Sequence, residues 1–381
     1  ALATGGAVIA SQYLGRKDEE NASHSAAQLY SVLGISTITV GVVCMLLSRP
    51  ILRGVFGSID DDVMRFAQQY FLISAVSYPF IGLYNGGAQG NSRISMLASL
   101  VMNVINIAGN ALLIYGFGMG VIGAALATLI GRVFAAVFIL WQNQNMHNPL
   151  RVQHFADLRP RREPIMKVLS IGIPSGLENG MFQIGKLFTQ SLITSYGTAA
   201  IAANATGSTI ELLATIPAAA MGLALTTVVG QCVGAGDYQS VKEYSWKLMK
   251  WAYVMLWGLN IVIIFMTPTI ASWYNLSAEA DHLARILIWY HSACCMVMWP
   301  AAWTLPSILR AAGDVKFIMV SSIIIMWVFR IGLAYVIGGL MQPMGLGVWG
   351  VWIAMTIDWF ARCVCNAWRL KSGKWKRGAV I

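Results

Sequence analysis

Long apolar stretches, separated by short polar breaks, make up most of the sequence. An α-helix needs about 20 apolar residues to cross the hydrocarbon core of a bilayer. Repeated stretches of that length predict an all-α integral membrane protein with many spans. We place about eleven spans, at residues 1–13, 27–48, 64–87, 94–115, 119–142, 165–195, 206–232, 248–271, 283–309, 316–340 and 345–369.

Composition excludes the main alternatives to a membrane protein. Charged residues make up 11% of the 381 residues, against roughly 25% in a typical soluble domain. A soluble domain of this size would need more polar surface. A disordered chain would contain fewer hydrophobic residues than the 57% found here.

The net charge of +10 has two competing interpretations. Nucleic-acid-binding proteins cluster Lys and Arg on one face, whereas here the basic residues lie mainly in alternate connections between apolar stretches. That alternation follows the positive-inside rule, which places basic loops in the cytoplasm. We therefore expect no nucleic-acid partner, a multi-pass protein of the cell (inner) membrane, and a cytoplasmic C-terminus.

The first apolar stretch is shorter than the others. Eleven spans that end in the cytoplasm must start outside, yet residue 1 is Ala and the stretch 1–13 is too short to cross a bilayer as a helix. We expect that the sequence is a fragment from which one complete helix and the start of the next are missing.

Short motifs recur in the same order in both halves of the chain. The pairs are 12–18 with 231–237, Tyr78-Pro79 with Trp299-Pro300, Gly90-Asn91-Ser92-Arg93 with Gly313-Asp314-Val315-Lys316, and 120–124 with 347–351. The two members of each pair lie on the same predicted side of the membrane, so the halves are parallel repeats. We expect two six-helix lobes, the first truncated: 1–145, a cytoplasmic linker 146–164, and 165–381.

Motifs for enzymatic chemistry are weak. Residues 118–123 and 345–350 both fit G-x-G-x-x-G, but neither has the βαβ setting of a dinucleotide site. Close helix approach at a tight turn explains both better. The chain has no H-E-x-x-H or Walker A pattern, and its six cysteines lie in or beside apolar stretches. We expect neither an enzyme nor a cofactor or metal.

Charged residues inside the predicted spans carry more information. Each costs roughly 2.5–3.5 kcal/mol at a helix centre, so it should face protein or a wet cavity. Asp358 and Arg362 are four residues apart and can pair on one helix face, and Arg330 can compete for Asp358. This cluster is either a structural ion pair or a functional site. The other such residues are Glu178, Lys186 and Glu211.

Glu178 is the strongest candidate for a functional residue. It lies one turn after Pro174 and points away from the glycine stripe at 172, 176 and 180. Asn179 and Gln183 add polarity nearby, and Lys186 lies two turns further on. A lone carboxylate in a half-buried cavity can bind and release a proton, and it can attract a cationic substrate. We therefore favour function over structure here.

The intramembrane polarity of the first half comes from amides. Asn103, Asn106 and Asn110 share one helix face. Such residues either bond neighbouring helices together or line a site, and we favour the first interpretation.

The chain resembles the bacterial multidrug and toxic compound extrusion (MATE) family. The matching stretches are GAVIASQYLGR at 6–16, VIGAALAT at 121–128, GIPSGLEN at 172–179, AAIAAN at 199–204, and Asp358-Trp359 followed by Gly373-Lys374-Trp375. The resemblance implies two lobes facing a central cleft and export of organic cations or other amphiphiles in exchange for H⁺ or Na⁺. Much of the family has an acidic residue where this chain has Phe182.

Three functional hypotheses follow. The first is an antiporter that exports organic cations or drugs in exchange for H⁺ or Na⁺, with small amphiphilic or cationic substrates, the bilayer as its surroundings, and a monomeric state. The second is a lipid-linked oligosaccharide flippase of a related fold, which would need a strongly basic cavity. The third is a membrane enzyme, which would need a nucleophile–base or metal constellation within the spans.

Overall fold

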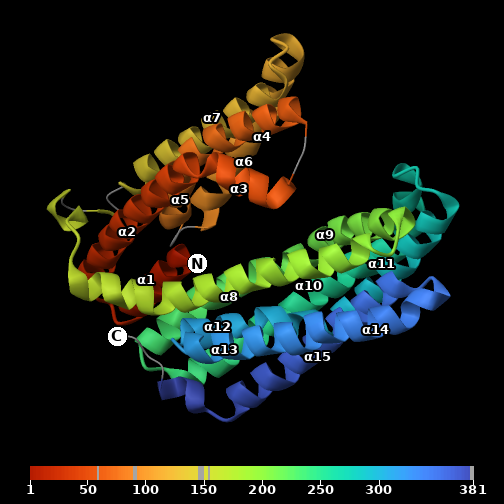
Figure 1. Ribbon diagram of the computed structural model, residues 1–381. Helices are drawn as coiled ribbons and strands as arrows, with labels where there is room; N and C mark the ends of the chain where they lie inside the picture. Colours follow the sequence, from red (N-terminus) through yellow and green to blue (C-terminus); the bar gives the residue numbers. More distant parts are fainter. Residues whose placement is uncertain (58–59, 89–91, 145–149, 153–154, 378–381) are drawn as a thin grey trace. The chain divides into compact units, whose positions relative to one another are not determined.

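The computed structural model describes residues 1–57, 60–88, 92–144, 150–152 and 155–377. Helices account for almost all of these residues, and the described ranges contain no β-strand (Figure 1). Eight helical segments are long and apolar enough to cross a membrane. The predicted fold class, an all-α integral membrane protein, is therefore confirmed.

The chain divides into two compact units. The N-terminal unit is Leu2–Gly172, and the C-terminal unit is Ile173–Ile381 together with Ala1. The division falls inside one long helix, α8 (Arg162–Thr194), whereas the sequence suggested a linker at 146–164. Part of that linker, at 145–149 and 153–154, lies outside the described residues.

The N-terminal unit contains seven α-helices before α8, with one π-helix and one 3₁₀ turn. They are α1 (Leu2–Gly15), α2 (Glu19–Leu46), α3 (Ser48–Phe56), α4 (Asp61–Val76), α5 (Tyr78–Gly87), α6 (Ser92–Asn110), η1 (Ala111–Gly116), α7 (Gly120–Asn143) and η2 (Phe155–Leu158).

The C-terminal unit continues from α8 with helices that run side by side in Figure 1. They are α9 (Thr198–Gly234), α10 (Tyr238–Trp273), α11 (Ala278–Trp299), η3 (Pro300–Thr304), α12 (Pro306–Ala311), α13 (Val315–Ile325), η4 (Met326–Gly332), α14 (Leu333–Met341), η5 (Gln342–Met344), α15 (Gly347–Lys371) and η6 (Lys374–Arg377).

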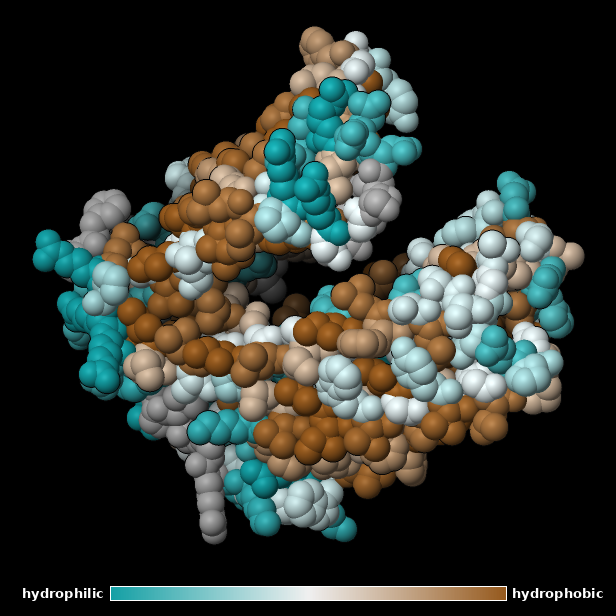
Figure 2. All heavy atoms as spheres, in the orientation of Figure 1, coloured by the Kyte–Doolittle hydropathy of each residue, from teal (hydrophilic) through white to brown (hydrophobic). Residues whose placement is uncertain are grey.

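Side-chain polarity follows the helices as a membrane requires. On the face drawn in Figure 2, hydrophobic side chains cover the middle of the helices of the C-terminal unit, and hydrophilic side chains gather at helix ends. Many large apolar side chains are exposed, among them Leu187, Leu223 and Phe265. Exposed apolar side chains in such numbers are typical of a surface that meets lipid rather than water.

The repeat is visible in the turns that the motifs form. The turn after α1 and the turn after α9 make the same backbone hydrogen bonds: Asp18 N donates to Tyr13 O, and Asp237 N donates to Cys232 O, both at 3.0 Å. Each aspartate then caps the next helix, accepting from the backbone N–H three residues later. At these turns and in the helices α2 and α10 that directly follow them, residues 219 apart therefore occupy equivalent places in the two units.

The glycine motifs at the last helix of each unit also match. α7 starts at Gly120 and α15 at Gly347. A Cβ atom on Gly350 would lie 2.7 Å from the Gly338 backbone, and one on Gly123 would lie 3.0 Å from Leu113. These glycines allow close helix approach, as predicted, and no strand precedes either. Gly90 and Asn91 of the remaining motif lie outside the described residues.

Prolines interrupt a long helical segment at equivalent places. Pro79 follows the break between α4 and α5, and Pro300 opens the π-helix η3, where Leu305 N donates to Pro300 O. Proline lacks the N–H that a continuous helix needs at this point. The helical segment Ala278–Ala311 therefore changes from α-helical to π-helical hydrogen bonding at Pro300.

Candidate functional site

Glu178 does not lie alone in its cavity. Its side chain projects from α8 and is buried, with 8% exposed. Arg310 of α12 donates from one Nη atom to both carboxylate oxygens, at 2.9 and 3.0 Å. Ser322 of α13 donates its hydroxyl to the same carboxylate at 2.9 Å. The expectation of a lone carboxylate was therefore wrong, because an arginine assigned to the following loop folds back to pair with it.

Arg362 links this pair to a second carboxylate. Its Nη atoms donate to the hydroxyl of Ser322 at 2.9 Å and to the Ser322 carbonyl at 3.2 Å. Its Nε atom donates to Asp358, at 3.2 and 3.1 Å from the two oxygens. Arg330 of η4 lies 3.8 Å from Asp358. The predicted pairing of Asp358 with Arg362 and Arg330 is thus present, and all three side chains are buried.

The side chains form one continuous chain of polar contacts from α12 to η4. Its order is Arg310, Glu178, Ser322, Arg362, Asp358 and Arg330. We call it the charge chain. The neutral Ser322 hydroxyl is its middle link, since it donates to Glu178 and accepts from Arg362.

Aromatic faces cover two of the three arginines of the charge chain, Arg362 and Arg330. The guanidinium of Arg362 lies 4.5 Å from the Trp303 ring, and that of Arg330 lies 5.2 Å from the Phe182 ring. The two rings meet edge to face at 5.0 Å. Lys186 lies 5.3 Å from Phe182. Cation–π contacts of this kind stabilise a cation that has left bulk water.

A cavity of about 210 Å³ opens beside these groups. Its lining includes Glu178, Asn179, Phe182, Trp303 and Arg310. Charged and aromatic side chains therefore converge on one space inside the helical unit. That space can accept a small ion or one polar end of a larger molecule.

The charge balance of this region is positive. The charge chain contains three arginines and two carboxylates, so its formal net charge is +1 at neutral pH. Each carboxylate is already paired with an arginine. An anion or a neutral polar group therefore meets less repulsion here than an organic cation does.

The other predicted residues of α8 contribute unequally. Asn179 lines the cavity and donates to the Ser175 carbonyl at 2.8 Å. Gln183 and Lys186 are exposed and do not line it. Of the glycine stripe, Gly172 lies in the N-terminal unit with its backbone close to Gly5, whereas a Cβ atom on Gly180 would meet no atom within 4 Å.

Of the three predicted asparagines of α6, Asn106 bonds to a neighbouring helix. Asn106 donates to Thr128 of α7 at 3.1 Å, and Asn110 donates to Asn106 at 3.1 Å. Asn103 donates to the Ser99 carbonyl in its own helix. The bond of Asn106 fits the helix-bonding interpretation, whereas the bonds of Asn103 and Asn110 stay within α6.

Three residues of the site were missed by the sequence analysis. Arg310 was counted as a loop charge, whereas it ends the short helix α12 and points to Glu178. Long basic side chains at span ends commonly reach along the helix, and that signal could have suggested the pair. Ser322 and Trp303 carry no local signal, since serine and tryptophan are ordinary residues of membrane helices.

Repeated bundles of apolar helices with a charged internal cavity define a multi-pass membrane transporter. A family model described as MatE matches residues 1–112 and 174–336. The chain belongs to this family, the multidrug and toxic compound extrusion transporters.

Similar proteins agree with that assignment. The chain is 24% identical over 387 residues to the uncharacterized transporter YisQ of Bacillus subtilis (strain 168), covering 98% of this chain and 83% of YisQ. It is 24% identical over 362 residues to the probable multidrug resistance protein NorM of Thermotoga maritima, covering 90% of this chain and 75% of NorM.

Solved structures share the fold. A crystal structure of MATE in the bent conformation superposes with a TM-score of 0.87 at 22% identity, covering 99% of this chain and 84% of that chain. A MOP superfamily transporter from Pyrococcus furiosus Vc1, described as having a binding pocket of reverse polarity, superposes with a TM-score of 0.85 at 22% identity, covering 98% of this chain and 84% of that chain.

Proposed function

We propose that the chain is a secondary active antiporter that exports small amphiphilic or cationic molecules in exchange for H⁺ or Na⁺. Membership of the MatE family supports transport. The observation that carries the coupling step is the buried Glu178 carboxylate, which two donors from two other helices hold in a cavity. The proposal includes no cofactor besides the coupling ion and no enzymatic activity.

Glu178 can act as a switch because its charge holds α8 to its neighbours. A proton on the carboxylate removes the negative charge that binds Arg310, and a Na⁺ ion competes with Arg310 for the same oxygens. In either case the bond between α8 and α12 weakens. Occupancy of Glu178 therefore biases the unit between two arrangements, which is what exchange transport requires.

The test uses cells or proteoliposomes that contain the full chain. Efflux of an ethidium-type cation is measured under an imposed pH gradient and, separately, under a Na⁺ gradient. Glu178→Gln keeps the shape and removes the charge, so efflux should be lost at unchanged protein level. Normal efflux by this variant would remove Glu178 from the mechanism, and efflux without either gradient would contradict antiport.

A second candidate is movement of an amphiphile with an anionic head group, as in a lipid-linked oligosaccharide flippase. The net charge of +1 of the charge chain beside the cavity favours it. A fluorescent pyrophosphate lipid and the ethidium-type cation, offered separately to the same vesicles, distinguish the candidates. Translocation of the lipid alone would replace the cation hypothesis.

We also propose the orientation and the oligomeric state. Basic residues gather at one end of the spans, so the linker and the C-terminus lie in the cytoplasm by the positive-inside rule. The transporter works as a monomer in the cell (inner) membrane.

A further inference from the structure

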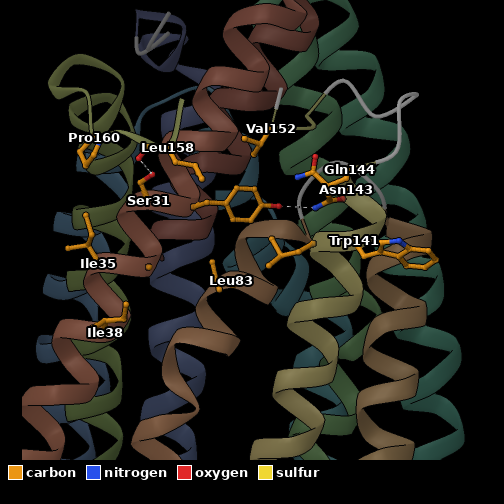
Figure 3. Close-up of a pocket in the computed structure, with 13 residues that line it drawn as sticks. Ser31, Ile35, Ile38, Leu83, Trp141, Asn143, Gln144, Val152, Leu158 and Pro160 are labelled. Carbon is orange, nitrogen blue, oxygen red and sulfur yellow. Dashed lines mark hydrogen bonds between the residues drawn. The ribbon is translucent and has the colours of Figure 1, made fainter. Parts of the chain in front are cut away.

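A second, larger cavity lies within the N-terminal unit, and no residue of the charge chain lines it. Its volume is about 670 Å³, within the range of small-molecule sites. Helices α2, α5 and α7 form its walls, and residues of the linker close one end (Figure 3). The wall residues used below are Gly34, Ile35, Ile38, Leu83 and Trp141.

The walls of this cavity are apolar and open to the outside of the unit. Ile35, Ile38 and Trp141 are 56%, 53% and 69% exposed. They lie on α2 and α7, two helices long and apolar enough to cross a membrane. Apolar side chains exposed on such helices are suited to contact hydrocarbon chains. The cavity is therefore shaped for an apolar chain rather than for a polar solute.

The repeat provides an internal comparison for this cavity. Counting 219 residues on from α2, Gly34 corresponds to Tyr253 and Ile38 to Trp257 of α10. In α10 the Tyr253 hydroxyl donates to Val297 O at 3.2 Å and the Trp257 indole to Met296 O at 2.8 Å. Aromatic side chains thus bridge α10 and α11 where α2 has small or aliphatic ones.

Gly34 is the residue that keeps the cavity open. A Cβ atom on Gly34 would meet no atom within 4 Å. A glycine inside a membrane helix usually permits close packing of a neighbour, and here no neighbour occupies the space. The equivalent aromatic residue in the other unit shows that the fold accepts a large side chain at this register.

Hydrogen bonds from α2 hold linker residues 157–161 over the cavity. The Gln28 amide donates to the carbonyls of Asp157 and Arg159 at 2.5 and 2.8 Å, and its oxygen accepts from Arg161 N at 2.8 Å. Ser31 donates to Leu158 O at 2.6 Å, as Figure 3 shows. Because α2 holds the backbone of linker residues 157–161 at four points, the side chains of these residues stand at fixed places along the rim.

Arg159 stands on that rim, and Arg162 follows it as the first residue of α8. Arg159 lies between Leu158 and Pro160, which both line the cavity. Arg159 and Arg162 are exposed, and within the described residues their guanidinium groups have no acidic partner. Arginines beside an apolar pocket at the cytoplasmic end of membrane helices are suited to bind the phosphate of an anionic lipid.

We infer that the N-terminal unit binds one anionic phospholipid of the cytoplasmic leaflet. An acyl chain lies over Gly34 between α2 and α7, and the head-group phosphate binds Arg159 and Arg162. The assignment of this lipid to the cytoplasmic leaflet depends on the orientation proposed above. The lipid site itself does not depend on the transport hypothesis.

The experiment measures binding of phosphatidylglycerol and phosphatidylcholine to the purified full chain by native mass spectrometry. Phosphatidylglycerol should bind preferentially. Gly34→Phe fills the cavity and should abolish this preference, and Gly258→Phe, at an equally open glycine of α10, should keep it. Ile38→Trp is a second filling variant that reproduces the residue found in α10.

The rim is tested separately. The double variant Arg159→Gln/Arg162→Gln removes two arginines from the rim. Because each arginine contributes roughly 1 kcal/mol near an anionic lipid, phosphatidylglycerol binding should weaken roughly thirtyfold. Lys242→Gln/Lys250→Gln removes the same charge elsewhere and should leave binding unchanged. Equal binding of both lipids by the wild type, or wild-type binding by the filled variants, would overturn the site.

Two further outcomes separate this inference from the transport hypothesis. Displacement of phosphatidylglycerol by an ethidium-type cation, with loss of efflux in Gly34→Phe, would assign the cavity to the substrate and overturn the lipid site. If a thiol reagent added outside sealed cells labels Arg162→Cys, the assignment of the lipid to the cytoplasmic leaflet is wrong. Loss of efflux in Glu178→Gln with unchanged lipid binding agrees with both proposals.

Discussion

Arg310 and Glu178, which lie 132 residues apart in the chain, form an ion pair in which one Nη atom is shared between both carboxylate oxygens. The pair joins α8 to α12, just beyond the proline-opened π-helix η3. The ion pair is therefore a structural contact between α8 and α12. It is also the contact that an ion binding at Glu178 would break.

Breaking this ion pair from the arginine side should destabilise the protein. Arg310→Gln leaves a buried carboxylate without its counter-charge. Because the arginine side chain is 21% exposed, we expect the free energy of unfolding to fall by about 1–3 kcal/mol, rather than by the 3–5 kcal/mol lost when a fully buried pair is broken. Thermal unfolding in detergent measures this, and Arg310→Gln/Glu178→Gln should recover part of the loss. A double variant less stable than the single one would contradict the pairing.

Asp358 should be more important for stability than Glu178. It is fully buried between Arg362 and Arg330, so Asp358→Asn leaves two buried cations without a carboxylate. A loss of about 3–5 kcal/mol is expected, seen as lower expression and a lower melting temperature. Glu178→Gln serves as the comparison. Equal melting temperatures for the two variants would show that the Asp358 cluster does not fix the C-terminal helices.

Asn106 should contribute only modestly to the stability of the protein. Its bond to Thr128 joins α6 to α7, and hydrogen bonds between membrane helices average roughly 0.6 kcal/mol. Asn106→Ala should therefore lower the melting temperature slightly and leave efflux close to wild type. Loss of efflux at normal stability would instead move the asparagines into the transport site.

Gly350 should not tolerate even a methyl group. A Cβ atom there would lie 2.7 Å from the backbone of Gly338 on α14, and relieving such overpacking costs typically about 1–3 kcal/mol. Gly350→Ala should be destabilised by that amount. Gly339→Ala on the same hairpin has no atom within 4 Å of the new Cβ and should behave as wild type.

The cap of α10 should depend on pH. Hydrogen bonds from the side chain and backbone of Ser240 lower the pKa of Asp237 below its usual value of 3.8. The carboxylate therefore stabilises the helix start above the pKa of the unfolded chain, and this contribution is lost as the pH falls through the lowered folded-state pKa. Hydrogen exchange at the Ser240 amide should accelerate in acid for wild type more than for Asp237→Asn.

Local periodicity was enough to predict the helices and the pairing of Asp358 with Arg362, because those features depend on residues close in sequence. The repeat was predictable because short motifs recur in the same order in both halves. The contacts of Glu178 were not predictable in this way. Ser322 lies 144 residues from it, and only the packing of α13 against α8 brings them together. The residue type at position 178 suggested a function, whereas the partners that set its chemistry come from tertiary structure.

The hydroxyl of Ser322 has one further consequence. A hydroxyl carries a single hydrogen, and that hydrogen is already committed to Glu178 while the oxygen accepts from Arg362. If the carboxylate of Glu178 is neutralised, the hydrogen is free to rotate, and the electron density offered to Arg362 changes with it. An event at α8 is thereby communicated to α15 through the reorientation of one bond, before either helix has to shift.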